Sequence, residues 1–331
     1  MTSVSESERR TSYAVALYEA LRDQLRLDPQ LTVLGNWIFG LNYDHLMDAL
    51  RNEFRGRIVE PPVAEAAIAA LGVGAAMAGA PTFVDLTIGS FALLAMSPIV
   101  NEASVIHYLS NGQVAVPVVF HLMHGVVGSG VQHSCSPQAQ LWNSPGLQIV
   151  MPSTPYDAKG LMTTALRSPN PTVFIDHPKL FTIEGVVPEA SYAIPFGTAD
   201  IKRSGRDVTV VATSNMVQVA LGAAESLSKE GIDIEIVDLR TLVPLDEQTL
   251  LDSVGRTGRL AVLDESVRRC GVASEIIAVI AESAHKLLRT RPVRITRADV
   301  PSPFSSVLGG ALMPDQASVV SALREYVRSD G

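Results

Sequence analysis

Short apolar, β-branched runs alternate with longer stretches of helical periodicity along nearly the whole chain, and this alternation restricts the possible folds more than any other feature. Apolar residues recur at helical spacing over residues 11–27, whereas residues 114–122 form a continuous apolar run typical of a strand buried on both faces. Strands that alternate with helices are usually joined by parallel crossovers. The sequence therefore predicts an α/β fold in which helices cover both faces of a mostly parallel sheet.

The predicted elements form two series, separated by a weakly patterned segment at residues 179–205. In the first series, strands are predicted at residues 31–34, 57–59, 82–86, 114–122, 147–151 and 172–175, and helices at 11–27, 43–54, 62–79, 91–108 and 155–165. In the second, strands are predicted at 208–212, 234–238, 259–263 and 293–296, and helices at 216–230, 246–255, 273–288 and 315–328. We therefore expect a first domain over residues 1–190, a linker over 191–205 and a smaller domain over 206–331.

Composition excludes several classes of protein. The 331 residues carry a net charge of −8 and no basic cluster, which disfavours nucleic acid and membrane surfaces as partners. Two cysteines, Cys135 and Cys270, do not make a disulfide framework, and the polar N-terminus is not a signal peptide, so we expect a cytoplasmic protein. Residues 66–84 lack charge, but their Ala, Gly and Pro content indicates a buried helix and strand rather than a membrane span.

A single carboxylate, Glu65, begins a helix that is otherwise free of charge. Pro62 suits the first position of this helix, because its missing amide is not needed there. An unpaired carboxylate in apolar surroundings is costly, so Glu65 is either partnered or functional. The alternative is an exposed first-turn glutamate, which the helix dipole favours.

Three histidines, His121, His124 and His133, are expected in one loop after the strand at residues 114–122. This position, at the carboxyl end of a parallel strand, makes His133 a candidate acid/base or oxyanion partner, although a surface loop histidine is the alternative. A metal site is a further alternative, but the spacing matches no common ligand pattern. Neither of the glycine-rich stretches, GVGAAMAG and HGVVGSG, has the context of a phosphate-binding motif, and in the first the glycines are expected to allow close helix packing.

Several long motifs occur in a characteristic order: PPVAEAAIAALGVGAAMAG, FALLAMSPIVNEA, QHSCS and PGLQIVMPSTPYDAKGL. Together they resemble the β subunits of the thiamine-diphosphate-dependent 2-oxo acid dehydrogenases, of the pyruvate, branched-chain and acetoin types. The later motifs VVATSNMVQVAL and VDLRTLVPLD resemble the C-terminal domain of transketolases. The resemblance implies a pyrimidine-binding parallel-sheet domain that is followed by a smaller transketolase C-terminal α/β domain.

The resemblance also implies roles for particular residues. Glu65 matches the glutamate that bonds the aminopyrimidine ring of the cofactor and stabilises its imino tautomer, which then deprotonates the thiazolium carbon. Phe91 matches the aromatic residue that packs on the pyrimidine, and Val63 is a further cofactor contact. His133 matches the active-site histidine that handles substrate or the acyl-transfer intermediate. A structural potassium ion is implied, held mainly by backbone carbonyls, at Val118, Ala165, Leu166, Ser168 and Asn170.

A partner is implied as well, because the chain lacks the Gly-Asp-Gly motif with which this family holds Mg²⁺ and the diphosphate. An α subunit is expected to supply that half of the site in an α2β2 heterotetramer. An acyl acceptor, either a lipoyl or carrier protein or a small molecule such as a sugar, is the other expected partner.

Some positions depart from the family pattern. Gly35-Asn36-Trp37 stands where a Gly-Glu-Asp sequence is usual, His121 to His124 replace an arginine and a Gly/Pro-rich stretch, Cys135 replaces a glutamine, and Ser168 replaces an acidic residue. These changes suggest a donor or acceptor other than pyruvate and lipoyl protein. Two alternatives stay open: the C-terminal subunit of a split transketolase that moves a ketol unit, and a non-catalytic assembly subunit.

Overall fold

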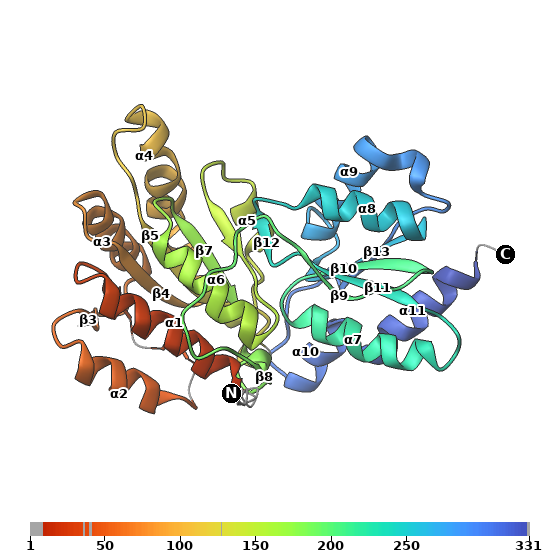
Figure 1. The fold of residues 1–331 in the computed structure, drawn as a ribbon, viewed down its shortest axis with the longest axis horizontal. Helices are drawn as coiled ribbons and strands as arrows, with labels where there is room; N and C mark the ends of the chain where they lie inside the picture. Colours follow the sequence, from red (N-terminus) through yellow and green to blue (C-terminus); the bar gives the residue numbers. More distant parts are fainter. Residues whose placement is uncertain (1–8, 36, 40–41, 127, 330–331) are drawn as a thin grey trace, which may run out of the picture.

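A computed structural model of the chain describes residues 9–35, 37–39, 42–126 and 128–329. The molecule has two lobes that lie side by side, each built around one sheet with helices on both faces (Figure 1). The red-to-green N-terminal part of the chain forms one lobe, and the green-to-blue C-terminal part forms the other. Within the described ranges, no helix has both the length and the apolar character needed to cross a membrane.

The first lobe contains a seven-stranded sheet. Its strands, in spatial order, are β12 (Thr241–Val243), β6 (Gln148–Val150), β7 (Thr172–Asp176), β5 (Val118–Met123), β4 (Thr82–Ile88), β2 (Thr32–Leu34) and β3 (Ile58–Val59). All neighbours run parallel except β12, which pairs antiparallel with β6. The edge strand β12 comes from the C-terminal half of the sequence, so the two halves share this sheet.

The second lobe contains a five-stranded sheet, and a short ribbon lies outside both sheets. The five strands, in spatial order, are β14 (Val293–Arg297), β13 (Leu260–Val267), β10 (Val208–Ala212), β11 (Ile234–Asp238) and β9 (Asp200–Arg203). Only β9 runs antiparallel to its neighbour. The ribbon pairs β1 (Arg10–Ser12) with β8 (Glu184–Val186). The predicted mostly parallel α/β architecture is therefore confirmed.

Helices cover the two faces of the first sheet according to the alternation of side chains along its strands. On β4, Phe83 packs into the cluster formed with α1, α2 and α6, whereas Val84 packs into the cluster formed with α3. The helical elements of this lobe are α1 (Tyr13–Leu27), α2 (Asp44–Glu53), α3 (Glu65–Met77), η1 (Gly89–Leu93), η2 (Ser97–Ala103), α4 (Ser104–Leu109), η3 (Val131–His133), α5 (Gln138–Trp142), α6 (Pro155–Arg167) and η4 (Pro178–Leu180).

The second sheet is covered by α7 and α11 on one face and by α8 and α9 on the other. The cluster under α8 and α9 is continuous with the α3 side of the first lobe, so one hydrophobic core runs between the lobes. The elements of this lobe are α7 (Asn215–Ser228), α8 (Glu247–Thr257), α9 (Val272–Ala284), η5 (His285–Leu287), α10 (Ser306–Leu312) and α11 (Gln316–Arg328).

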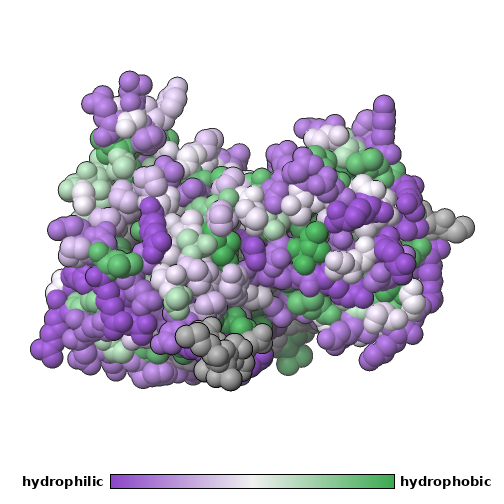
Figure 2. Space-filling model, in the orientation of Figure 1, coloured by the Kyte–Doolittle hydropathy of each residue, from purple (hydrophilic) through white to green (hydrophobic). Residues whose placement is uncertain are grey.

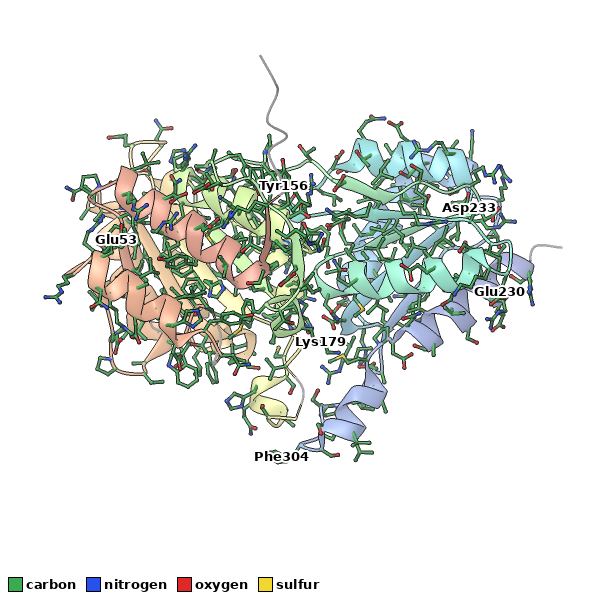
Figure 3. All side chains as sticks on the ribbon, turned by 60° about the horizontal axis from the view of Figure 1, so that its bottom comes forward. Glu53, Tyr156, Lys179, Glu230, Asp233 and Phe304 are labelled. Carbon is green, nitrogen blue, oxygen red and sulfur yellow. The ribbon has the colours of Figure 1, made fainter. Side chains whose placement is uncertain are left out.

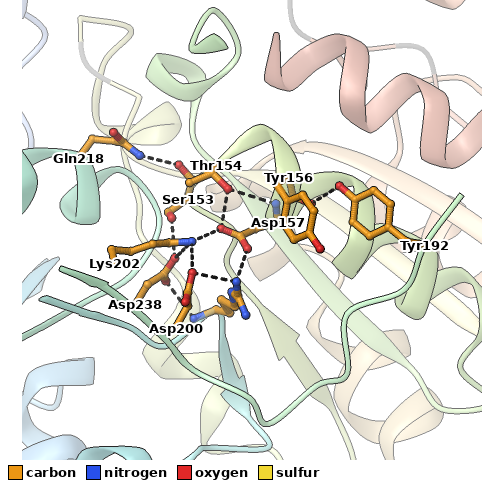
Figure 4. Close-up of polar contacts among 10 residues, drawn as sticks. Ser153, Thr154, Tyr156, Asp157, Tyr192, Asp200, Lys202, Gln218 and Asp238 are labelled. Carbon is orange, nitrogen blue, oxygen red and sulfur yellow. Dashed lines mark hydrogen bonds and ion pairs between the residues drawn. The ribbon is translucent and has the colours of Figure 1, made fainter. Parts of the chain in front are cut away.

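An ion-pair network also joins the lobes (Figure 4). The buried carboxylate of Asp157, in the first turn of α6, lies 2.5 Å from Lys202 Nζ and 2.8 Å from an Arg240 Nη. Lys202 lies on β9 and Arg240 follows β11, and both also contact Asp200. Since these partners satisfy charges that are withdrawn from water, the network fixes the position of one lobe against the other.

The surface is mixed in character. On the face drawn in Figure 2, hydrophobic residues are scattered among hydrophilic ones. Phe304 lies on a segment before α10 that projects from the body beside the loop that follows β5, as Figure 3 shows. The segments approach closely, because a Cβ at Gly128 would lie 3.0 Å from Ser306 Cβ.

Four sequence predictions are wrong in detail. Helix α3 begins at Glu65, with Ala64 as its N-cap, so Pro62 lies before the helix and not at its first position. The helix predicted at residues 91–108 is divided into the 3-10 helix η1, the π-helix η2 and the α-helix α4, and Pro98, which has no amide to donate to the preceding turn, accounts for the break before η2. The segment at 179–205 contains β8 and β9, and His121 lies inside β5 and not in the following loop.

The glycines of α3 confirm the expected close packing at one position. A Cβ at Gly72 would lie 2.3 Å from Val84 Cγ2, so this glycine lets α3 approach β4. Gly74 has no neighbour within 4 Å of such a Cβ and has no packing role of this kind.

Candidate active site

A cavity of about 620 Å³ lies beyond the carboxyl ends of β2, β4, β5 and β7. Parallel sheets place ligand sites at this end, where the loops diverge. All four residues with predicted cofactor or catalytic roles line it: Val63, Glu65, Phe91 and His133. The predicted site residues therefore come together although they span 71 positions of the sequence, from 63 to 133.

Glu65 is the first residue of α3, and its side chain is half-buried at the cavity wall. No hydrogen bond or ion pair to its carboxylate is present in the described part of the chain. Glu65 also lies in the first turn of α3, where the helix dipole favours a carboxylate, so the first-turn alternative applies to the same position. A carboxylate held there without a protein partner is available to a ligand.

Phe91 and His133 form an aromatic pair beside Glu65. Their ring centroids are 5.3 Å apart and the rings meet edge to face, at 72°. Phe91 belongs to η1 and His133 ends η3, and Gly89 lets η1 approach the segment that follows η3, since a Cβ there would lie 2.8 Å from Pro137. His133 Nδ1 is buried and has no hydrogen-bond partner. An unbonded ring nitrogen on this side of the cavity is suited to hold or move a proton.

Beneath the cavity lies a buried network in which every charged group has a partner. His121 Nδ1 lies 3.1 Å from Asp85 Oδ1, and its Nε2 lies 2.8 Å from Asp176 Oδ2. The Tyr13 hydroxyl donates to the other oxygen of Asp176. Burial lowers the pKa of His121, but the hydrogen bonds to Asp176 and Asp85 outweigh it and raise the pKa to about 9. The imidazolium is therefore charged at neutral pH and pairs with both carboxylates, which offsets one of their two negative charges.

Asp85 connects this network to the cavity wall. Its two oxygens accept hydrogen bonds from the backbone amides of Trp37 and Thr87, each at 2.9 Å. Thr87 has a φ of 63°, a strained value for a β-branched residue, and such strain persists only where neighbours hold it. Asp85 thus positions two segments that line the cavity. The neighbouring residue Asn36, where a glutamate is usual in the family pattern, lies outside the described residues.

His124 and His177 form a second buried cluster, at the junction between the lobes. His177 Nε2 lies 3.2 Å from Glu265 Oε1 and its Nδ1 accepts from the Lys179 amide, whereas His124 Nε2 contacts the Ser214 hydroxyl at 3.3 Å. Burial lowers the pKa of His124 to about 4, so this ring is neutral at pH 7. His121, His124 and His133 therefore occupy three separate environments. In the described ranges, no three His, Cys, Asp or Glu side chains are arranged to hold a metal ion.

The residues predicted to hold potassium gather where α6 ends and β5 and β7 begin. Ser168 is the C-cap of α6, and its hydroxyl donates to Gln148 Oε1 at 2.7 Å and accepts from the Asn170 amide at 3.1 Å. Val118 begins β5, next to β7 in the sheet. The Ser168 hydroxyl is thus occupied by protein partners, and any ion here would depend on backbone carbonyls.

The cavity suits one half of thiamine diphosphate. Its walls are mainly apolar and aromatic, and Glu65, Asp85 and His133 are the ionisable side chains that line it other than Tyr43. No lysine or arginine of the described residues lines it, so it offers no charge to a diphosphate. Glu65 and the Phe91 ring suit an aminopyrimidine, whereas the diphosphate and Mg²⁺ need groups from elsewhere.

Sequence reasoning did not anticipate several residues of the wall. Trp37, Tyr43, Met123, Val126 and Phe181 line the same cavity. Most of them follow the carboxyl ends of predicted strands, so the order of strands in the sheet is the signal that would have found them. Phe181 lies in the segment at 179–205, where the pattern is too weak to predict a position.

Comparison with known proteins identifies the domains and the relatives. Residues 10–182 match the model of the transketolase pyrimidine binding domain, and residues 197–319 match that of the transketolase C-terminal domain. The chain is 38% identical to the acetoin:2,6-dichlorophenolindophenol oxidoreductase subunit beta of Cupriavidus necator, over 97% of this chain and 98% of that protein. It is 36% identical to the 2-oxoisovalerate dehydrogenase subunit beta of Bacillus subtilis, over 95% and 98% of the two chains.

A solved structure agrees in fold. It is described as a split-gene transketolase in an inactive β4 tetramer, and it superimposes with a TM-score of 0.79 at 22% identity, over 97% of this chain and 99% of that one. Both domain models match in order, and the chain is 36–38% identical to two β subunits over nearly their full length, so its family is established. The chain belongs to the transketolase-like family of β subunits of thiamine-diphosphate-dependent 2-oxo acid dehydrogenases.

Proposed function

We propose that this chain is the β subunit of an enzyme that decarboxylates a 2-oxo acid and transfers the acyl unit to an acceptor. The observation that carries the proposal is the unpartnered Glu65 carboxylate, which shares one cavity with the Phe91–His133 pair. The named relatives act on acetoin and 2-oxoisovalerate, substrates that such a cavity can hold beside its apolar walls. The acceptor is a lipoyl protein, a carrier protein or a sugar.

Each residue has a distinct part. Thiamine diphosphate, when bound, supplies the nucleophilic carbon and the electron sink for decarboxylation. Glu65 holds a proton against a ring nitrogen of the aminopyrimidine, and Phe91 and Val63 orient that ring. His133 carries a proton to or from the donor substrate or the acyl group. The apolar wall excludes water, which strengthens these polar contacts.

The rest of the cofactor site comes from a partner. No lysine or arginine in the described ranges lines the cavity, and this supports an α subunit that binds the diphosphate and Mg²⁺ in an α2β2 assembly. A potassium ion at Val118, Ala165, Leu166, Ser168 and Asn170 is part of the same proposal. It would tie the end of α6 to β5.

Departures around the cavity support a donor or acceptor other than pyruvate and lipoyl protein. His121 replaces an arginine, but both of its ring nitrogens are bonded inside the protein, so it offers no charge to substrate. Met123, at the end of β5, and Val126, in the loop that follows, present apolar surface to the cavity. An uncharged side chain on the 2-oxo acid is best suited to such a wall.

The test is CO2 release from a panel of 2-oxo acids by the chain co-purified with its partner, in the presence of thiamine diphosphate and Mg²⁺. Glu65→Gln is expected to lower release at least about 100-fold, the usual scale of acid–base catalysis. Glu60→Gln is the matched control, because Glu60 pairs with Arg51 outside the cavity. Unchanged release by Glu65→Gln would indicate an assembly subunit. Ketose consumption without CO2 release would indicate the split transketolase.

A further inference from the structure

A second cavity, of about 930 Å³, lies between the lobes and shares no lining residue with the Glu65 cavity. The first lobe contributes lining residues from the segment 135–143. The second lobe contributes lining residues from the segment 266–275 and also Arg297, at the end of β14. Its volume lies within the range of small-molecule sites. Nothing in the proposed decarboxylation uses this cavity.

Arg297 is the buried charge of this cavity. It is only 7% exposed, and Nη1 and Nη2 donate to the backbone oxygens of Ser134 and Val300, at 3.2 and 3.1 Å. Its Nε is buried and has no hydrogen-bond partner. Among the described residues, no carboxylate lies within 4.0 Å of the guanidinium. Burial lowers the pKa of Arg297, and attraction to Cys135 and to the Glu265 carboxylate offsets this only in part.

Such a guanidinium is costly unless an anion balances it. Buried charges in folded proteins are normally paired, and one left unpaired loses its hydration without compensation. Two neutral carbonyl oxygens satisfy part of its hydrogen bonding but none of its charge. The missing partner is therefore an anion that enters from the cavity or from a neighbouring chain.

Other groups on the wall suit an oxyanion. Ser136 lies on the same wall and is only 9% exposed. Its hydroxyl oxygen is buried and has no hydrogen-bond partner. Helix α9, of 13 residues, begins at this cavity, but the Asp264 carboxylate already accepts a hydrogen bond from the Ala273 amide in its first turn, at 3.2 Å. Arg269 stands at the rim and pairs with Asp299, and Glu275 is the one carboxylate among the described residues that lines the cavity.

We propose that this interlobe cavity binds a small molecule that carries a phosphate group, with Arg297 as the counter-charge and Ser136 as a hydroxyl donor. Phosphate suits the set because it accepts several hydrogen bonds and carries the charge that Arg297 lacks. Both lobes contribute groups, so the ligand stabilises their junction. This site does not depend on the proposed decarboxylation.

The test is calorimetry with inorganic phosphate at constant ionic strength, on the complex of this chain with its partner. The complex is first saturated with thiamine diphosphate and Mg²⁺, so that phosphate cannot enter the cofactor site. Saturable binding is expected in the wild type. Arg297→Gln is expected to weaken binding at least about tenfold, the scale of a charged hydrogen bond. Arg269→Gln, at the exposed rim, is the control and is expected to change affinity less than about threefold.

A second variant keeps the test decisive if Arg297→Gln does not fold. Ser136→Asp places a carboxylate on the cavity wall, and it is expected to weaken phosphate binding at least tenfold while it raises the melting temperature of the complex. Equal affinity in wild type and in these variants would overturn the proposal. So would binding by the free chain but not by the complex, since a carboxylate of the partner subunit would then be the counter-charge. Glu65→Gln is expected to leave phosphate affinity unchanged.

Discussion

His121 and His133 lie twelve positions apart in the sequence, yet the fold uses them in opposite ways. His121 is wholly buried, and both of its ring nitrogens are bonded to carboxylates. His133 stands at a cavity wall against Phe91, and its Nδ1 has no partner. Asp85 belongs to both regions, since it bonds to His121 and also lines the cavity.

The difference teaches how to separate groups that hold the fold from groups that are free to act. A side chain whose hydrogen bonds are all made inside the protein contributes to stability and positions its neighbours. A polar side chain that is left unbonded beside a cavity costs stability, and this cost indicates a ligand. The same substitution at the two histidines is therefore expected to affect different measurements.

The largest effect is expected at His133. His133→Gln is expected to lower turnover of the complex by about 100-fold or more, because proton transfer by a positioned side chain contributes on that scale. The free energy of unfolding is expected to fall by no more than about 1.5 kcal/mol, since the ring loses its contact with Phe91 but no hydrogen bond. Steady-state kinetics and urea unfolding of the same preparation check both. A variant that is strongly destabilised to urea but keeps the turnover of the wild type would contradict this assignment.

The next effect is expected in stability, at His121. His121→Gln is expected to lower the free energy of unfolding by about 3 kcal/mol near pH 6, because the folded pKa of about 9 lies above the unfolded value of about 6.5. A raised histidine pKa stabilises the fold fully below the unfolded pKa, and the contribution is lost as pH rises from about 6.5 to 9. Urea unfolding should show that the difference in free energy of unfolding between wild type and variant is large at pH 6 and nearly absent at pH 9.

A control for the pH series is His285→Gln, because His285 is exposed and forms no side-chain bond among the described residues. Its difference from the wild type should stay near zero at both pH values. A gap for His121→Gln that stays constant from pH 6 to 9 would show that the ring is not the charged partner of Asp85 and Asp176.

A smaller effect is expected at Phe91, which links the two regions through its contact with His133. Phe91→Leu keeps apolar bulk but removes the ring, and it is expected to weaken thiamine diphosphate binding by about threefold to tenfold, the value of an aromatic contact. Titration of cofactor into the apo complex measures this. Leu93→Ala is the matched control, because Leu93 lies on the same short helix but is exposed and outside the cavity. Equal losses in both variants would remove Phe91 from the cofactor site.

Much of the fold could be predicted from sequence because its strands are buried, continuous apolar runs; β10 and β11 match their predicted ranges at both ends. Strand β12 could not be predicted, since three residues far along the chain carry no signal for pairing with β6. His121 was predicted to lie in a loop because a polar side chain is more common there than inside a buried strand. The two carboxylates that allow its burial lie 36 and 55 positions away in the sequence.

The candidate site was predictable to a similar degree and for similar reasons. Glu65 stands out as the one charge in an apolar helix, whereas Phe91 and His133 depended on their resemblance to family motifs. The interlobe cavity gave no signal, because Ser136 and Arg297 are brought together only by the packing of the two lobes.

The most direct test of the central claim is the exchange of the thiazolium C2 proton of bound thiamine diphosphate with solvent deuterium, in complexes of this chain with its partner. The wild-type complex and the Glu65→Gln complex are compared after cofactor binding is shown to be complete in each. If Glu65 activates the cofactor, exchange in the variant should fall at least about 100-fold while the cofactor stays bound. Equal exchange rates in the two complexes would contradict the account.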